Sequence, residues 1–325
     1  MIRVVLLGLG RIGAQADADA AYVGPALSHL GAIVTTPGLD VAGLVDPDPG
    51  ARAAVARRWP HLADRLYARL DEIKAADIDI ATVAGASTGR TADLMAVLAL
   101  KPRLVIAEKP FAADVSTAEA LVAAYRTAGV ELRVNYPRAL SPAYRHLRES
   151  LGRNGQWRIA LWYSHGLHHF GSHGIDLLLD WCGPVARVQT FGLTEAVDPL
   201  VDASLMFHSG DRATMHGIGL GDCAVFEMEI WTAEGRTLIG AGGATSQRQI
   251  PERGRYYPDY LQLGPAVELA PAAPIGGFAD LYEAAGNFIS AAAPMPGCNP
   301  DRALVGLRIQ DALLRSAAQA KAIHL

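Results

Sequence analysis

The chain has 325 residues and a formal net charge of −4, and half of its residues are hydrophobic. This length favours two domains that each bury a core, and the composition is too hydrophobic for a disordered chain. Three widely spaced cysteines exclude a disulfide scaffold. The sequence contains no block of basic residues that would favour nucleic-acid binding. It also contains no apolar run that approaches the ~20 residues needed to cross a bilayer. Met1 leads directly into a strand-like run without a signal-peptide pattern, so we expect a cytoplasmic protein with no nucleic-acid or membrane partner.

From Ile2 to Asn135, short apolar runs alternate with Ala-rich helical stretches, which is typical of βαβ units around a parallel sheet. The predicted strands are Ile2–Leu7, Val41–Val45, Ile78–Val83, Leu104–Ala107 and Val130–Val134. The predicted helices are Ala26–Val34, Ala51–Arg58, Thr88–Ala99 and Val115–Ala128. Asp114 is expected to cap the last helix and Gly129 to end it. The first domain is therefore predicted to be an α/β domain with a doubly wound parallel sheet.

After Pro137 the pattern changes to alternating apolar and polar residues over positions 203–240, which predicts an antiparallel sheet with one covered face. The second domain is thus predicted to be α+β. The Gly/Pro-rich stretch Gly240–Gly276 shows few regular signals, so we expect a functional or poorly ordered loop there. Two amphipathic helices, Phe278–Ala291 and Pro300–Gln319, close the chain, and the second is a candidate for packing back on the first domain.

A glycine-rich turn, Gly8-Leu9-Gly10-Arg11-Ile12-Gly13, follows the first predicted strand directly. In this pattern the first glycine makes a tight turn, the second lets a pyrophosphate approach the backbone and the third allows close helix packing. The free N–H groups at the helix start then face the phosphates. The strand context therefore predicts a dinucleotide-binding loop that contains Gly8, Gly10, Arg11, Ile12 and Gly13.

An acidic residue that binds the ribose is expected at the end of the second strand, where the sequence has Asp46. Asp46 lies further from the loop than the usual ~20 residues, and we interpret the polar segment Ala14–Gly24 as an insertion. A carboxylate there accepts two hydroxyls and repels a 2′-phosphate, which favours NAD over NADP. Two alternatives stay open. Asp46 could be only a turn residue, because Asp is common in turns at strand ends, and NADP could bind if Arg11 reaches its phosphate.

Glu108-Lys109-Pro110 follows the strand Leu104–Ala107, at the sheet edge where ligands bind in open α/β folds. A lysine there can donate a hydrogen bond to a substrate hydroxyl and stabilise the alkoxide character that develops as hydride leaves. From the tripeptide alone, a solvated Lys109 paired with Glu108 is the simpler interpretation.

Four histidines lie within nine residues, from His165 to His173. A helix is expected from about Gly171, with His173 and Asp176 on one side and apolar residues opposite, and with His169 one turn earlier. A histidine that titrates near neutrality can take a hydroxyl proton while the carbon loses hydride. Because the segment lacks an H-E-x-x-H pattern and a cysteine partner, we predict no metal site.

These motifs in order resemble the glucose–fructose oxidoreductase / inositol dehydrogenase / MocA (Gfo/Idh/MocA) family: the glycine-rich loop, Glu108-Lys109-Pro110, Asn135-Tyr136-Pro137-Arg138 and Gly171-Ser172-His173-Gly174-Ile175-Asp176. The resemblance implies a Rossmann NAD(P)-binding domain over residues 1–136. It implies a substrate-binding and oligomerisation domain over 137–325, with a largely antiparallel open sheet that often makes homodimers or homotetramers. It also implies a nicotinamide cofactor and a sugar, sugar nucleotide, aminosugar or cyclitol that reacts at a ring carbon.

On this resemblance Lys109 is the catalytic lysine and His173 the general acid/base. Many members have Asp four residues before that histidine, where this chain has His169, so Asp176 is the candidate relay partner and His169 the alternative. The family often shows Thr-Pro-Asn after the fourth strand, where this chain has Ala84-Gly85-Ala86-Ser87-Thr88-Gly89-Arg90. Ser87 is therefore the side chain expected to contact the cofactor there. Glu108, Lys109 and Asn135 complete the predicted cofactor contacts.

Two other classes of function stay open. The first is a catalytically silent NAD(P)-binding sensor or regulatory protein, against which the presence of both Lys109 and His173 argues. The second is a metal-dependent hydrolase or lyase built on the histidines from His165 to His173.

Overall fold

The computed structural model describes residues 1–17, 24–73, 77–269, 277–291 and 293–325, and it forms two compact units. The first unit comprises Met1–Leu140 and Gly276–Leu304, and the second comprises Ser141–Ile275 and Val305–Leu325. The single boundary predicted after residue 136 differs from this division, in which each unit contains two separate stretches of chain.

The first unit contains a six-stranded parallel sheet in the order β3-β2-β1-β4-β5-β6. The strands are β1 (Ile2–Leu7), β2 (Leu39–Val45), β3 (Leu66–Tyr67), β4 (Ile80–Val83), β5 (Leu104–Ala107) and β6 (Glu131–Val134). This sheet confirms the predicted doubly wound α/β fold. The prediction missed β3, because two residues are too short a run to produce a hydrophobic pattern.

The connections between these strands are mostly helical. They are η1 (Arg11–Gln15, a π-helical turn), α1 (His29–Thr35), α2 (Pro49–Arg58), η2 (Pro60–Arg65), η3 (Leu70–Glu72), α3 (Arg90–Leu98) and α4 (Val115–Ala128). A short helix, α5 (Pro137–Leu140), follows β6. The Asp114 carboxylate accepts a 2.8 Å hydrogen bond from the Thr117 N–H, and Gly129 ends α4 with a φ of 66°, which confirms both predicted caps. Helix α1 begins after Ser28, whose hydroxyl caps it by accepting from the Gly31 N–H. Residues 18–23 of the predicted insertion lie outside the described residues.

Helix α8 (Phe278–Ala291) packs on α1 in the first unit, although it lies far away in the sequence. Its buried face, which includes Leu281 and Tyr282, joins the same core as Leu30 and Ile33 of α1. The helix expected to pack back on the first domain was the later one, Pro300–Gln319. This helix, α9, begins in the first unit, to which its residues up to Leu304 belong, and contributes its residues from Val305 onward to the second unit.

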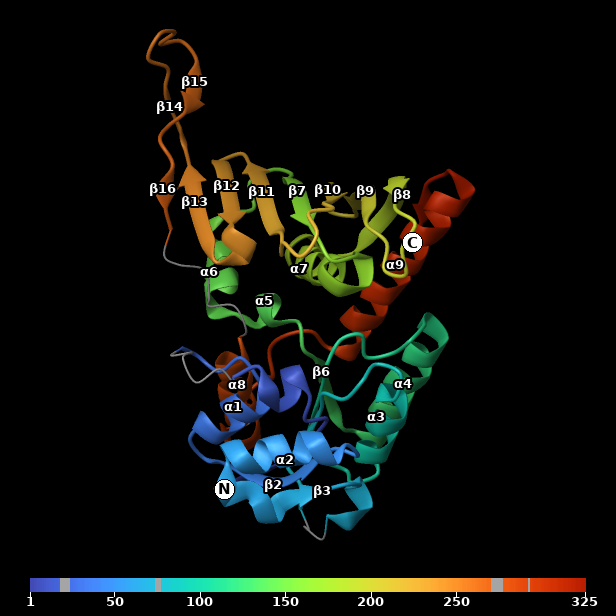
Figure 1. Cartoon of the computed structure of the whole chain (residues 1–325). Coiled ribbons are helices and arrows are strands. Elements are labelled where there is room, and N and C mark those ends of the chain that lie inside the picture. Colours follow the sequence, from blue (N-terminus) through green and yellow to red (C-terminus); the bar gives the residue numbers. More distant parts are fainter. Residues whose placement is uncertain (18–23, 74–76, 270–276, 292) are drawn as a thin grey trace. The chain divides into compact units, whose positions relative to one another are not determined.

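The second unit contains a nine-stranded sheet in the order β16-β13-β12-β11-β7-β10-β9-β8-β17. β10 and β7 are parallel and the other pairs are antiparallel, so the predicted, largely antiparallel sheet is confirmed. Helices α7 (Ser172–Cys182) and α9 lie on one face (Figure 1). The remaining helix of this unit is α6 (Pro142–Ser150), and the strands are β7 (Arg158–Tyr163), β8 (Val185–Leu193), β9 (Val201–Phe207), β10 (Arg212–Gly217), β11 (Phe226–Thr232), β12 (Gly235–Gly240), β13 (Thr245–Gln249), β16 (Val267–Glu268) and β17 (Ile323–His324).

The segment after Gly240 carries more regular structure than predicted. After the short turn η5 (Ala241–Gly243), β13 adds to the sheet beside β12, and β14 (Pro251–Arg253) and β15 (Leu261–Leu263) form a hairpin. The prediction was wrong because β13 reads Thr-Ser-Gln-Arg-Gln, so its strand character comes from backbone pairing without an apolar alternation. Residues 270–276 lie outside the described residues. Among the helices that the structure describes, none is long and apolar enough to span a membrane.

Candidate active site

Four of the predicted site segments of the first unit follow parallel strands: the glycine-rich loop after β1, Asp46 after β2, Ser87 in the loop after β4, and Lys109 after β5. Because the strands are parallel and adjacent, these segments all lie at the carboxyl edge of one sheet. The structure thus brings the predicted dinucleotide-binding residues and the predicted catalytic lysine to the same edge.

The glycine-rich loop is closely packed on one side and open on the other. A Cβ atom on Gly13 would collide with the Gly8 carbonyl oxygen, and one on Gly8, whose φ is +90°, would collide with the Gly85 backbone. A Cβ on Gly10 would meet no atom within 4 Å. This is the division of roles that the motif predicts, with two glycines for tight packing and one that leaves space for a pyrophosphate.

Asp46 is tied to this loop by hydrogen bonds. Its Oδ2 accepts from the Leu9 N–H at 2.7 Å, and its Oδ1 accepts from the Asp48 N–H at 2.9 Å. Each carboxylate oxygen has a second lone pair and can still accept a hydroxyl. Arg11 and Ile12 are exposed at the start of η1. The residues at this edge therefore fit a dinucleotide, with open space over Gly10 and acceptors at Asp46.

The loop after β4 contains the exposed Ser87 and a residue that the sequence analysis missed, Arg90. The Arg90 guanidinium donates to the Pro110 carbonyl at 2.7 Å and to the Gly85 carbonyl at 2.5 Å. Burial lowers the pKa of Arg90, while the nearby carboxylates of Glu108 and Asp93 oppose that change. Arg90 thus joins the loop behind Gly8 to the turn that carries Lys109. An arginine at a helix start, where the dipole disfavours cations, was the signal available in the sequence.

Glu108 is buried and accepts hydrogen bonds from three groups. Its Oε1 accepts from the Asn135 amide at 2.6 Å and lies 3.1 Å from His29 Nε2, and its Oε2 accepts from the Lys109 N–H at 3.3 Å. Burial alone would raise the pKa of Glu108, but the hydrogen bonds from His29 and Asn135 and the charge of Lys109 together hold it below its usual value. Glu108 is therefore an ionised support for the turn. A direct contact of Glu108 or Asn135 with a cofactor stays a prediction.

Lys109 is half-buried, and its peptide bond to Pro110 is cis. The backbone on its N-terminal side is bonded to Glu108, and the carbonyl of Pro110 on its C-terminal side is bonded to Arg90. Two buried charged groups thus fix the turn on either side of the lysine.

The histidine segment of the second unit begins with the π-helical turn η4 (Leu167–Gly171), which leads directly into α7. Asp198, which the sequence analysis missed, accepts from the His168 N–H at 2.8 Å and from the His169 N–H at 2.9 Å. The Ser172 hydroxyl donates to the carbonyls of both histidines at 2.9 Å. These bonds satisfy backbone groups at the helix start and fix the path of the chain before His173.

The predicted helix start is confirmed within one residue, and His173 lies half-buried in the first turn of α7. Its ring meets the ring of Phe170 edge-on, with centroids 6.4 Å apart. Asp176, in contrast, is only 4% exposed and is buried like Ile175. The predicted pairing of His173 and Asp176 on one side of the helix stays a prediction, and the structure adds that the Asp176 end of that side is buried.

The other histidines have separate surroundings. His169 is exposed, stacks on Phe170 at 5.0 Å and meets His165 edge-on at 6.3 Å. His168 binds Gln310 of α9 through Nδ1 at 2.8 Å. Within the described ranges, no group of three or more His, Cys, Asp or Glu side chains is placed to hold a metal ion.

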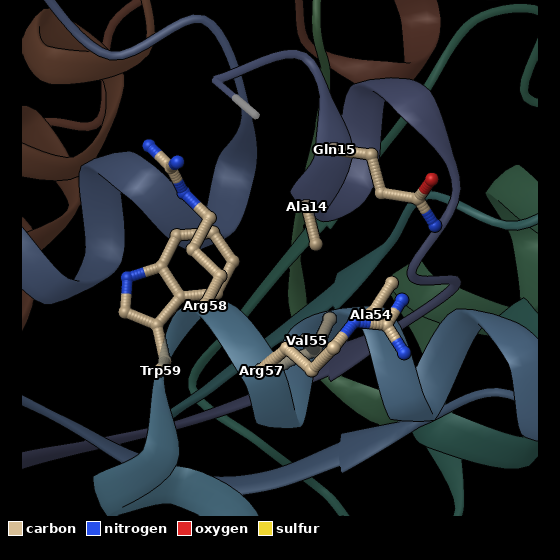
Figure 2. A pocket seen from close by; sticks show the side chains of 7 residues that line it. All are labelled: Ala14, Gln15, Ala54, Val55, Arg57, Arg58 and Trp59. Carbon is tan, nitrogen blue, oxygen red and sulfur yellow. The ribbon is translucent and has the colours of Figure 1, made fainter. Parts of the chain in front are cut away.

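A groove of about 340 Å³ lies in the first unit beside the glycine-rich loop. Figure 2 shows its lining, which comes from η1, the C-terminal half of α2 and the residue that follows α2: Ala14, Gln15, Ala54, Val55, Arg57, Arg58 and Trp59. The Arg58 guanidinium lies over the Trp59 ring at 5.1 Å. The groove shares no residue with the predicted dinucleotide site, so it is a separate feature of the first unit.

Residues 2–136 match the family model described as "Oxidoreductase family, NAD-binding Rossmann fold". The protein is therefore an NAD-binding oxidoreductase with a Rossmann domain at its N-terminus. The matched residues are similar to the Gfo/Idh/MocA family, the family that the sequence motifs resemble. No curated protein sequence matches the chain.

Several solved structures share the fold of nearly the whole chain. A dehydrogenase from Chromobacterium violaceum has a TM-score of 0.78 at 18% identity, with 98% of this chain and 96% of that chain covered. UDP-N-acetylglucosamine 3-dehydrogenase GnnA from Acidithiobacillus ferrooxidans has a TM-score of 0.76 at 17% identity, with 97% of each chain covered. The WlbA dehydrogenase from Bordetella pertussis, in complex with NADH and UDP-GlcNAcA, has a TM-score of 0.74 at 18% identity, with 100% and 98% covered. At these identities the similarity shows the fold alone.

Proposed function

We propose that the protein transfers hydride between a nicotinamide cofactor and a ring carbon of a sugar, sugar nucleotide, aminosugar or cyclitol. The observation that carries this proposal is the common sheet edge, where the glycine-rich loop is bonded through Leu9 to Asp46 and where Lys109 is held between Glu108 and Arg90. A dinucleotide site and a fixed ammonium group at one edge are the parts that alcohol oxidation needs.

When bound, the dinucleotide would supply or accept the hydride. Asp46 would accept the two ribose hydroxyls, and its charge would repel a 2′-phosphate, so NAD is preferred to NADP. The open space over Gly10 would take the pyrophosphate. Ser87, exposed in the loop after β4, would add a side-chain contact.

Lys109 would donate a hydrogen bond to the substrate oxygen and stabilise the negative charge that develops on it. His173 would take the hydroxyl proton during oxidation and return it during reduction. Asp176 is the proposed partner that orients His173, and His169 is the alternative. The burial of Asp176 in α7, three residues after His173, suits a fixed supporting group.

The substrate class is supported by the resemblance of the motifs to the family and by the names of structural neighbours that act on or bind sugar nucleotides. The test begins with mass spectrometry of the cofactor that co-purifies, followed by absorbance at the NADH band with a panel of cyclitols, aminosugars and nucleotide sugars. Turnover with one of these classes is the expected result. Tight NAD binding without turnover on any alcohol, including simple polyols, would favour a regulatory NAD-binding protein.

We also infer a homodimer or homotetramer from the same resemblance, and a cytoplasmic location from the cysteine usage. The cysteines Cys182, Cys223 and Cys298 are all free thiols, which suits a reducing compartment. Light scattering of the purified chain tests the assembly, and a monomer at working concentration would contradict it.

A further inference from the structure

A continuous chain of polar side chains crosses the core of the first unit and ends at Glu108. The Tyr282 hydroxyl of α8 lies 2.8 Å from Thr82 Oγ1 of β4 and 2.9 Å from His29 Nδ1 at the start of α1. His29 Nε2 lies 3.1 Å from Glu108 Oε1. Thr82, His29 and Tyr282 are fully buried, so solvent cannot replace any of these contacts.

The direction of the hydrogen bonds follows from the charge at one end. An ionised Glu108 can only accept, so His29 Nε2 carries a hydrogen and donates it. His29 Nδ1 then accepts from the Tyr282 hydroxyl if the ring is neutral, or donates to it if the ring is charged. In either state the Thr82 hydroxyl is the second hydrogen-bond partner of the Tyr282 hydroxyl. Tyr282 therefore fixes the orientation of the His29 ring. Burial raises the pKa of the Tyr282 phenol, so Tyr282 keeps its hydroxyl hydrogen.

Apolar residues would fill this part of the core at lower cost, because buried polar groups stabilise a fold only when all of them are bonded. The position of this series of polar side chains indicates its role. Glu108 accepts from His29 and Asn135 on one side and from the Lys109 backbone N–H on the other. The orientation of the carboxylate therefore fixes the backbone of the residue that we assign to catalysis.

We propose that His29, oriented by Tyr282, is a positioning residue for Lys109, because it holds the carboxylate to which the Lys109 backbone is bonded. This inference rests on the proposed function, in which Lys109 acts on the substrate oxygen. The titratable or charged groups that face Glu108 are His29, Lys109, Arg90 and Tyr282. Removal of the His29 donor should raise the pKa of Glu108 and loosen the turn.

The first measurement follows the Glu108 carboxyl directly, by NMR of the chain labelled with ¹³C at the glutamate side-chain carboxyls. The Glu108 signal is assigned by its absence in Glu108→Gln. In His29→Leu we expect the Glu108 titration midpoint to rise by about one unit or more, and in Tyr282→Phe we expect a smaller rise. Tyr125→Phe is the matched control, since Tyr125 is a buried tyrosine of the same unit whose hydroxyl donates to the Leu94 carbonyl, away from Glu108.

The second measurement is the dependence of kcat on pH for the same variants. In His29→Leu and Tyr282→Phe we expect a loss of kcat at acid pH, below the limb set by His173, that follows the raised Glu108 midpoint. We expect kcat in His29→Leu to fall about tenfold or more while KM for the cofactor changes less than about twofold. Tyr125→Phe loses a comparable buried hydrogen bond and should leave both quantities as in the wild type.

Three results would overturn the proposal: a Glu108 midpoint in His29→Leu equal to that of the wild type, a raised midpoint with unchanged kcat, or equal effects in Tyr282→Phe and Tyr125→Phe. If His29→Leu does not fold, the comparison of the two tyrosine variants decides. If the wild type shows no turnover at all, the proposed function fails. The carboxyl titration then still decides whether His29 holds Glu108.

Discussion

The Leu9 backbone N–H donates a 2.7 Å hydrogen bond to the Asp46 carboxylate. This bond joins the turn after β1 to the end of β2, so the groups that would meet a pyrophosphate and a ribose form one connected structure before any ligand binds. A site formed in this way loses little conformational freedom on binding. The loop and Asp46 can still be tested separately by mutation, because the loop would contact the pyrophosphate of the cofactor and Asp46 would contact its ribose.

Asp46→Ser should narrow or invert the preference for NAD(H) over NADP(H). Serine removes the negative charge that repels a 2′-phosphate and keeps a polar group at the end of β2. We expect a change of about tenfold or more in the ratio of the two dissociation constants, measured by calorimetry. Asp48→Asn, two residues later at the cap of α2, removes one charge and should leave the ratio nearly unchanged. Tighter binding of NADP(H) by the native protein would assign Arg11 a phosphate-binding role in place of this role for Asp46.

Gly10→Ala and Gly13→Ala should impair different properties of the protein, namely NAD affinity in the first and stability in the second. The methyl group added by Gly10→Ala would enter open space, so the fold should keep its stability while NAD affinity falls about tenfold or more. The methyl group added by Gly13→Ala would meet the Gly8 carbonyl oxygen, a backbone atom that cannot rotate away, so the first unit should be destabilised as well. Thermal unfolding and calorimetry of both variants separate the two effects. Equal loss of stability in both would contradict the assignment.

Lys109→Met should lower kcat by about 100-fold or more, because a donor aimed at developing charge is worth about 3–4 kcal/mol. The fold and the cofactor affinity should be nearly unchanged, since the turn is held by its backbone and by Glu108 and Arg90. Lys101→Met, an exposed lysine of the same unit, is the control in steady-state assays. A Lys109→Met enzyme with more than about a tenth of wild-type turnover would remove the lysine from the chemical step.

His173→Asn should lower the rate of alcohol oxidation by about 100-fold or more and flatten the limb of the pH profile that rises toward neutral pH. Asparagine cannot accept the proton that leaves with the hydride. His168→Asn is the comparison, because His168 binds Gln310 through its ring and is given no part in the reaction. Equal losses in the two variants, or an unchanged profile in His173→Asn, would transfer the role to His169 or His165.

Glu108→Gln should destabilise the protein by about 1–3 kcal/mol at neutral pH, because the glutamine amide would face the donors of His29 and Asn135. The pKa of Glu108 is lower in the folded than in the unfolded chain. Its contribution is therefore complete above the unfolded value of about 4.3 and is lost as the pH falls through the folded value. Urea unfolding from pH 7 to pH 3 should show the difference from the wild type shrinking at the acid end. Glu283→Gln, on the exposed side of α8, should show no such trend.

The elements that the sequence predicted best are those whose signals are local. β1, β5 and α4 have the predicted bounds, because continuous apolar runs are typical of strands buried on both faces and because Asp114 and Gly129 mark both ends of α4. The strands β3 and β13 were missed, since one is very short and the other is polar. Both strands form by pairing with neighbouring strands, and the sequence of each segment alone does not reveal those neighbours.

The same distinction holds for the site. The glycine-rich loop, Asp46 and Lys109 could be found because each follows a predicted strand. His29, Asp198 and Tyr282 could not, because each acts through a partner distant in the chain, such as Glu108 for His29. A single histidine or tyrosine on an amphipathic helix carries no local sign of the group that it will meet in the core.

The packing of α8 against α1 has a consequence for the order in which the protein folds during synthesis. The ribosome has synthesised every strand of the parallel sheet before it reaches Phe278. At that stage Leu30 and His29 still lack α8, the helix that covers them. The first unit can complete its core only after residue 291 has emerged, by which time most of the second unit has been made. Folding therefore includes a closure between distant parts of the chain, which is slow compared with local contacts. An N-terminal fragment ending at residue 140 should expose the apolar face of α1 and aggregate.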